Sequence, residues 1–149
     1  DRADVAAATG ADGVHVGESD LPTALARRVV GPARLVGRTA HDLEEARAAA
    51  LDGADSLGVG PCFPSETKAF GSYASPEFLR GVVEETSLPA FAIGGITCER
   101  VDEIASLGLT RIAVASAVTA AADPGRAAAA IIERLERAAR PPAPVEPCR

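Results

Sequence analysis

Residues 41–61 read HDLEEARAAALDGADSLGVGP, and this stretch decides the fold class. Its first half, His41–Leu51, spaces its leucine and alanine side chains along one face of a helix. Its second half contains the short apolar run Ser56–Val59, which is typical of a buried strand. Between the two lies Gly53, a residue type that commonly ends a helix before a strand. The stretch therefore predicts a helix followed by a strand.

The same alternation runs along the rest of the chain. Further apolar runs predict strands at Gly13–Val16, Arg34–Val36, Ala90–Ile93 and Ile112–Ala115. Further amphipathic stretches predict helices at Leu21–Val30, Pro76–Glu85, Thr97–Leu107 and Asp123–Ala139. Ser75 and Asp123 each precede a proline and are predicted to cap the helices that follow them. Repeated strand–helix units of this kind predict an α/β fold with a parallel sheet.

The spacing of the strands fits two architectures. One is a doubly wound sheet, and the other is part of a (β/α)8 barrel, which needs roughly 200 residues or more when complete. Gly60–Ser75 is a long loop for an α/β array, which predicts a functional role for it. Arg140–Arg149 contains four prolines and is predicted to be a disordered or extended tail.

Charge, hydropathy and cysteine content narrow the range of partners. The formal charge is −6 and the chain has no basic cluster, so nucleic acid is not an expected partner. No apolar stretch approaches the roughly 18 residues that predict a membrane-spanning helix. Cys62, Cys98 and Cys148 form no metal-ligand pattern and are expected to be reduced thiols. We therefore expect a cytoplasmic protein that binds neither nucleic acid nor a membrane.

Polar residues follow the predicted strands, and parallel α/β folds bind ligands at the carboxyl ends of their strands. Gly94-Gly95 lies between a strand and a helix, where backbone N–H groups can approach an anion. Ser116 follows the last strand and can add a hydroxyl group. The sequence is compatible with a phosphate site here, or with a glycine pair that only makes a tight turn.

The long loop contains Ser65-Glu66-Thr67-Lys68, which places two hydroxyl groups and a cation in four residues. Hydroxyl groups and a lysine suit a phosphate or a pyrophosphate. The alternative is an ordinary solvated loop. The length of the loop and its place after a strand favour the functional interpretation.

Two acidic residues, Asp1 and Asp20, are candidates for binding a metal ion. Asp20 follows a strand, and carboxylates that face a polyphosphate commonly hold Mg²⁺. Alternatively, Asp20 caps the helix that begins at Leu21. His15 lies within a strand and His41 near a helix start, and both are interpreted as core or cap residues rather than catalytic ones.

Four segments, taken together, resemble the thiamine-phosphate synthase family. They read DRADVAAATGADGVHVGESDLP, VGRTAHDLEEARAAALDGADSLGVGPCFPSETK, LPAFAIGGIT and RIAVASAV, and they begin at residues 1, 36, 88 and 111. The resemblance implies a TIM barrel, of which residues 1–139 would be the fourth to eighth strands with their helices. It also implies the joining of hydroxymethylpyrimidine diphosphate and thiazole phosphate to give thiamine phosphate and pyrophosphate. In that reaction Mg²⁺ and cationic residues draw off pyrophosphate, and the thiazole nitrogen attacks the resulting carbocation.

The resemblance also assigns roles to single residues. The Mg²⁺ ligands would be Asp1 and Asp20. Contacts to the diphosphate side of the pyrimidine substrate would come from Thr39, and to pyrophosphate from Lys68. The hydroxyl groups that bind thiazole phosphate would be those of Ser65 and Thr67. In the last two loops, phosphate would be bound by Gly95 and Ser116.

Some features depart from the family pattern. Glu18-Ser19 replaces a commoner Gln-Glu or Gln-Asp pair, and the family's upstream Q-x-R-x-K segment is not part of this sequence. Two other interpretations therefore stay open: a thiazole tautomerase, whose family shares the barrel, and a non-catalytic remnant that binds phosphate. A sheet of five strands also leaves two open edges, which a longer chain or a second copy would cover.

Overall fold

The fold is a single sheet of parallel strands in the computed structural model, which describes residues 1–65 and 71–138. Its strands are β1 (Gly13–Val16), β2 (Leu35–Ala40), β3 (Ser56–Val59), β4 (Ala90–Ile93) and β5 (Ile112–Ala113). Its helices are α1 (Ala3–Thr9), α2 (Thr23–Val30), α3 (Leu43–Leu51), α4 (Pro76–Glu85), the 3₁₀ helix η1 (Cys98–Arg100), α5 (Val101–Ser106), α6 (Ser116–Thr119) and α7 (Pro124–Ala138).

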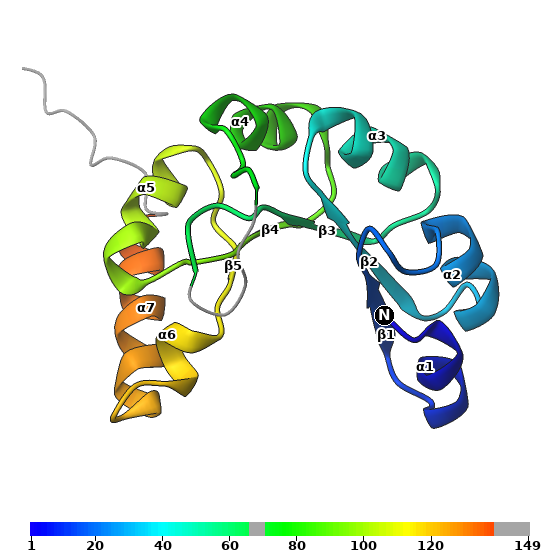
Figure 1. The fold of residues 1–149 in the computed structure, drawn as a ribbon, viewed down its shortest axis with the longest axis horizontal. Coiled ribbons are helices and arrows are strands. Elements are labelled where there is room, and N and C mark those ends of the chain that lie inside the picture. Colours follow the sequence, from blue (N-terminus) through cyan, green and yellow to red (C-terminus); the bar gives the residue numbers. More distant parts are fainter. Residues whose placement is uncertain (66–70, 139–149) are drawn as a thin grey trace, which may run out of the picture.

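The order of the strands in the sheet follows their order in the chain, from β1 to β5. A doubly wound sheet instead reverses its strand order at a switch point and carries helices on both faces. Figure 1 shows the sheet as an arch, with α2, α3 and α4 outside the curve and no helix of the described residues on its inner side. The doubly wound alternative is therefore excluded.

Three predicted strands, at Gly13–Val16, Ser56–Val59 and Ala90–Ile93, are confirmed at both ends. The second predicted strand was too short, because β2 continues through Thr39 to Ala40. The last was too long, because β5 ends at Ala113. The extension of β2 places Thr39 on the sheet itself rather than in the loop after it.

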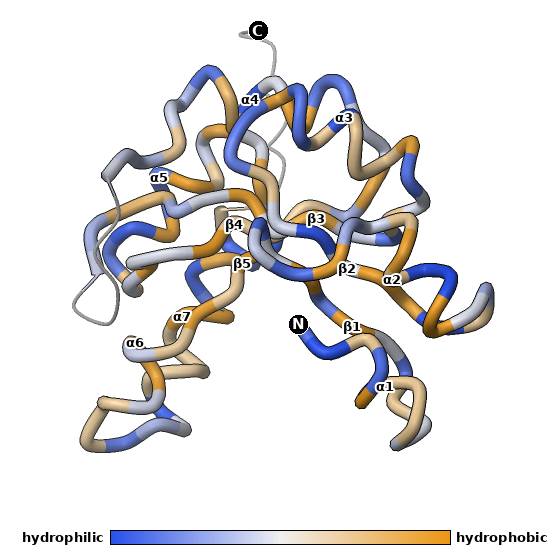
Figure 2. The backbone as a smooth tube through the Cα atoms, turned by 45° about the vertical axis from the view of Figure 1, so that its right-hand side comes forward, coloured by the Kyte–Doolittle hydropathy of each residue, from blue (hydrophilic) through white to orange (hydrophobic). Residues whose placement is uncertain are grey.

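The predicted caps of two helices are confirmed. Ser75 Oγ accepts the N–H of Phe78 at 3.2 Å, and Asp123 Oδ1 accepts the N–H of Arg126 at 2.9 Å. The helix predicted at Thr97–Leu107 begins instead with a 3₁₀ turn, and α1 and α6 lie in segments where no helix was predicted. Figure 2 shows hydrophobic and hydrophilic residues alternating along the helices.

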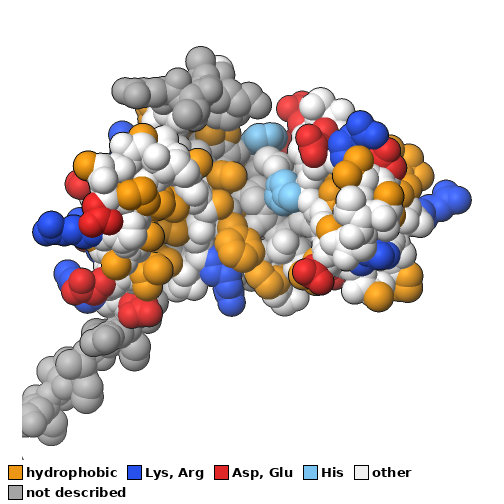
Figure 3. Space-filling model, turned by 90° about the horizontal axis from the view of Figure 1, so that it is seen from below, with side chains coloured by type: hydrophobic (Ala, Val, Ile, Leu, Met, Phe, Trp, Pro, Cys, Tyr) orange, Lys and Arg blue, Asp and Glu red, His pale blue; other side chains and the backbone are white. Residues whose placement is uncertain are grey.

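The two faces of the sheet differ in burial. The convex face, under the helices, carries buried residues such as Val16, Val36, Leu57 and Val59. The concave face carries the alternate residues of the same strands, which point the other way. Large apolar side chains on it are exposed: Leu35 by 60%, Phe91 by 37% and Ile93 by 40%. Figure 3 looks onto this side and shows histidine and apolar side chains in its hollow.

The amino ends of the strands are held together by Arg27 and Asp55. The Arg27 guanidinium forms an ion pair with Asp55 and donates to the carbonyl oxygen of Gly53 at 2.9 Å. Asp55 Oδ2 also accepts the N–H of Val36 at 2.7 Å, which ties α2, β2 and the turn before β3 to one carboxylate. Burial raises the pKa of Asp55, but the hydrogen bonds from Val36 and Arg27 outweigh it, so the net shift is downward.

Three predictions fall on residues that the structure does not describe. Thr67 and Lys68 lie between Glu66 and Phe70, and the proline-rich tail lies within residues 139–149. In the described part of the chain, no helix has the length and apolar character needed to cross a membrane.

Candidate functional site

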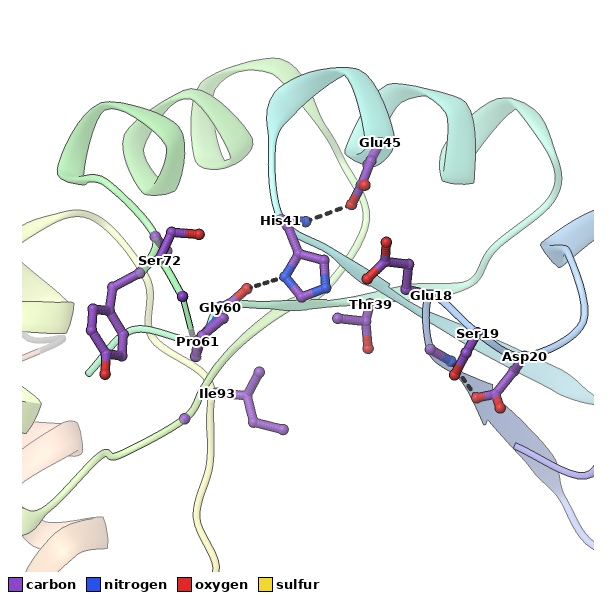
Figure 4. A pocket seen from close by; sticks show the side chains of 15 residues that line it. Glu18, Ser19, Asp20, Thr39, His41, Glu45, Gly60, Pro61, Ser72 and Ile93 are labelled. Atoms are coloured by element: carbon purple, nitrogen blue, oxygen red, sulfur yellow. Dashed lines mark hydrogen bonds between the residues drawn. The ribbon is translucent and has the colours of Figure 1, made fainter. Parts of the chain in front are cut away.

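A pocket of about 800 Å³ opens at the carboxyl ends of β1 to β4. The turn Gly17–Asp20 lines it after β1, Thr39 and His41 line it at the end of β2, and Gly60 and Pro61 line it after β3. Its remaining lining residues are Glu45, Gly71, Ser72, Tyr73, Ala74, Ile93 and Gly94. Figure 4 shows these side chains arranged around one opening. The pocket thus gathers residues that follow four of the five strands, while Ser116 and Ala117 after β5 do not line it.

Asp20 closes the turn that follows β1. Its Oδ2 accepts the N–H of Gly17 at 2.7 Å, and its own N–H donates to the carbonyl oxygen of Gly17 at 3.2 Å. Arg38 Nη1 donates to the same carbonyl oxygen at 2.8 Å. Helix α2 begins only at Thr23 and has no side-chain cap. The alternative in which Asp20 caps that helix is therefore wrong, and the carboxylate lies on the pocket wall.

Asp1 lies beside β1, because its backbone nitrogen donates to the carbonyl oxygen of His15. Asp1 and Asp20 supply carboxylate oxygens, the donors that Mg²⁺ prefers. No group of three or more His, Cys, Asp or Glu side chains among the described residues could enclose a metal ion. Mg²⁺ usually keeps several waters and takes only one or two carboxylates alongside substrate phosphates. Asp20 on the pocket wall is compatible with that mode of binding, and Asp1 lies beside the same strand.

Thr39 lies on the concave face and is contacted by His15. The distance from His15 Nε2 to Thr39 Oγ1 is 2.8 Å. Burial lowers the pKa of the His15 imidazole, and the positive charges of the amino terminus and Arg38 lower it further, while Asp20 acts in the opposite direction. The histidine that was interpreted as a core residue is thus bonded to a predicted site residue.

His41 is a pocket residue that the sequence interpretation treated as a core or cap residue. Its Nδ1 lies 2.6 Å from the carbonyl oxygen of Gly60, and its backbone N–H donates to Glu45 Oε2 at 2.8 Å. A carbonyl oxygen can only accept, so Nδ1 carries the proton and Nε2 is the ring nitrogen left for other partners. The signal for His41 was its position directly after a strand, within the polar rim.

Gly94 and Gly95 pack tightly against the loop after β3. Both have positive φ angles, of 96° and 61°. A Cβ on Gly95 would lie 2.4 Å from the carbonyl oxygen of Pro64, and one on Gly94 would lie 2.8 Å from Pro61 Cα. The N–H groups of Cys62 and Phe63 donate to the carbonyl oxygens of Ile93 and Gly94 at 2.9 and 3.0 Å. Backbone conformation and close packing therefore both require glycine here, whether or not an anion binds.

The pocket brings together only some of the predicted residues. Of those that the structure describes, Asp20 and Thr39 line it, while Asp1, Ser65, Gly95 and Ser116 do not. Ser116 is the exposed first residue of α6, after β5. The roles predicted for these residues stay predictions, as do those of Thr67 and Lys68.

Parallel strand–helix units with a polar pocket at the carboxyl ends of the strands define an α/β protein whose pocket lies where such folds commonly hold a ligand. Residues 1–118 match the family described as "Thiamine monophosphate synthase". The chain belongs to this family.

Individual relatives agree with the family match. The thiamine-phosphate synthase of Gloeobacter violaceus is 47% identical over 137 residues, which are 92% of this chain and 40% of the relative. That of Rhodopirellula baltica is 48% identical over 123 residues, which are 79% of this chain and 33% of the relative. The chain thus spans well under half the length of these two proteins.

A solved structure is also similar. The thiamine phosphate pyrophosphorylase from Pyrococcus furiosus superposes with a TM-score of 0.81 at 38% sequence identity, over 94% of this chain and 67% of the other.

Proposed function

We propose that the chain carries the thiamine-phosphate synthase site, which joins hydroxymethylpyrimidine diphosphate to thiazole phosphate and releases pyrophosphate. The observation that carries the proposal is the meeting of Asp20 and Thr39 on one pocket at the carboxyl ends of the strands, in a chain that matches the family over residues 1–118. Both positions match functional residues in the family resemblance.

We propose in addition that the sheet is the fourth to eighth strands of a (β/α)8 barrel. Two features support this: strand order follows chain order, and the concave face exposes large apolar side chains at Leu35, Phe91 and Ile93. The interior of a closed barrel is filled by packed side chains, so closure would bury these residues. The open edges of β1 and β5 are where a second copy of the chain, or a longer chain, would pair.

The diphosphate of the pyrimidine substrate would lie near Thr39 and Asp20. Asp1 and Asp20 would hold Mg²⁺, which when bound neutralises charge on the departing pyrophosphate. Thr39 contributes a hydroxyl group toward the diphosphate oxygens, and Lys68 a cation toward pyrophosphate. The protein thus stabilises the charge of a leaving group and needs little general acid–base chemistry.

Thiazole phosphate would be held on the other side of the site. Ser65 and Thr67 contribute hydroxyl groups toward it, and Gly95 and Ser116 backbone and hydroxyl donors. The tight packing of Gly95 against the loop that contains Pro64 supports this arrangement, because it holds the two proposed phosphate-binding segments side by side.

The test is to mix the purified chain with both substrates and Mg²⁺ and to measure thiamine phosphate and pyrophosphate. Equal amounts of the two products are expected. Binding of thiazole phosphate without any product would favour the non-catalytic remnant. Proton exchange on a thiazole carboxylate phosphate, without coupling to the pyrimidine, would favour the tautomerase.

A further inference from the structure

His15 reaches across the concave face of the sheet to a residue of the candidate site. It lies on β1, whereas Thr39 lies on β2. In the register of the two strands, His15 pairs with Gly37, two residues before Thr39. An aromatic side chain can span such a diagonal between neighbouring strands. The 2.8 Å contact from Nε2 to Thr39 Oγ1 shows that this one does so.

Two glycines leave room for the imidazole ring. A Cβ on Gly37 would lie 2.5 Å from His15 Nδ1, and a Cβ on Gly58 would lie 3.2 Å from His15 Cε1. Neither glycine is among the positive-φ glycines of the described chain, so backbone conformation does not require glycine at these positions. Glycine inside a strand often marks a close approach by another group. Here that group is the ring of His15, which lies over β2 and β3.

The polarity of the contact decides what Thr39 can offer to a ligand. A hydroxyl group has one proton and two acceptor lone pairs. If a ring N–H donates to Oγ1, the hydroxyl proton is left to point into the pocket and donate to an anionic oxygen. If the hydroxyl donates to the ring instead, it presents only lone pairs, which repel phosphate oxygens.

We propose that His15 is a positioning residue for Thr39: its Nε2–H donates to Oγ1 and directs the hydroxyl proton toward a diphosphate oxygen in the pocket. This inference rests on the proposed function and extends it to a side chain that does not line the pocket. In this proposal Gly37 and Gly58 also have a role, because their lack of side chains leaves the space that the His15 ring occupies.

Three variants of the full chain separate hydrogen bonding from packing. His15→Phe keeps a ring over the two glycines but removes the N–H. His15→Gln keeps an N–H donor at similar reach. Thr39→Val keeps the shape of the threonine but removes its hydroxyl group. One lost hydrogen bond of ordinary strength lowers kcat about fivefold to tenfold, and this is expected for His15→Phe and Thr39→Val alike.

The pattern among the variants distinguishes positioning from a general structural defect. We expect His15→Gln to recover most of kcat, the KM for thiazole phosphate to stay within about twofold, and His15→Phe to cause no further loss when Thr39 is already valine. Losses that multiply in the double variant, or an equal loss in His15→Gln and His15→Phe, would overturn the proposal.

A spectroscopic measurement keeps this inference separable from the proposed function. A long-range ¹H–¹⁵N correlation spectrum of the histidine rings is expected to show Nε2 of His15 protonated, with a shift on Thr39→Val that the His41 ring does not share. A ring protonated only at Nδ1 would overturn the proposal. If the wild-type chain shows no turnover, the proposed function fails, and a titration with inorganic pyrophosphate then tests the positioning role. If His15→Phe and Thr39→Val weaken pyrophosphate binding equally, the positioning role is supported. If they weaken it unequally, the positioning role is rejected.

Discussion

The carboxylate of Asp20 accepts the N–H of Gly17 at 2.7 Å, across the turn that follows β1. This bond uses Oδ2, so the side chain fixes the turn with one oxygen. An amide oxygen can accept the same N–H, because the bond needs an acceptor and not a full charge. The structural role of Asp20 can therefore be separated from its proposed role as a metal ligand by one substitution.

We predict that Asp20→Asn keeps the fold but raises the Mg²⁺ concentration needed for half-maximal turnover by roughly tenfold, the size of effect that follows a damaged metal site. A magnesium titration measures the second effect, and thermal unfolding in the absence of metal measures the first. An unaltered titration would remove Asp20 from the metal site.

Lys68→Ala is expected to lower kcat far more than it raises either KM. A cation that faces the departing pyrophosphate acts mainly in the transition state, and an interaction of that kind appears in kcat. Arg28→Ala, on the exposed side of α2, removes an equal charge and is the control that leaves turnover unchanged. Unchanged kcat in Lys68→Ala would exclude the pyrophosphate role.

Gly95→Ala is expected to destabilise the protein more than Gly10→Ala. Both glycines have positive φ, at 61° and 70°, so both variants carry backbone strain of about 1–2 kcal/mol. At Gly10 nothing lies within 4 Å of a new Cβ, whereas at Gly95 the carbonyl oxygens of Phe63 and Pro64 lie within 2.5 Å. The difference between the two free energies of unfolding, measured in urea, isolates the overlap, about 1–3 kcal/mol. Equal losses in the free energy of unfolding would mean that the loop after β3 moves away from the new Cβ at little cost.

Asp55→Asn is expected to lower stability by about 1 kcal/mol at pH 7, since the ion pair with Arg27 is partly exposed. The pKa of Asp55 is lowered in the folded protein, so its contribution is present above the unfolded value of about 3.9 and disappears as the pH falls through the folded value. Urea unfolding of both proteins between pH 3 and pH 7 should show the two curves converging at the acid end. A gap that is independent of pH would contradict the charge-based explanation.

Cys62 is expected to resist alkylation in the folded protein. Burial raises the pKa of its thiol to about 11, so very little thiolate is present at pH 8. Cys98 is less buried and should react faster than Cys62. Peptide mass spectrometry after a timed exposure to iodoacetamide, with a denatured sample as the reference, measures both rates. Reaction of Cys62 at the denatured rate would mean that its surroundings open readily.

The sequence predicted strands such as Ser56–Val59 well because their buried residues form short apolar runs. It missed the second half of β2 for a physical reason. There the concave face carries Gly37 and Thr39, which have little apolar surface of their own and leave room for the ring of His15. When the inner face of a strand consists of glycine and threonine, its sequence shows no apolar run and is easily taken for a loop.

The location of the site could be predicted, but its internal bonds could not. The rim follows from the rule that parallel strands place their carboxyl ends at one edge. The contacts from His15 to Thr39 and from His41 to Gly60 join different strands and loops. They depend on the register between elements, which no single segment of sequence reports.

The bonds from the N–H groups of Cys62 and Phe63 to Ile93 and Gly94 carry the pairing of β3 and β4 beyond their last strand residues. Mechanically, the edge of the pocket is therefore a continuation of the sheet. These bonds join Ile93 and Gly94 to the loop that begins at Pro61, whose carbonyl oxygen accepts the N–H of Ala74 just before α4. One run of backbone hydrogen bonds thus connects the end of β4 to the start of α4 through the loop after β3.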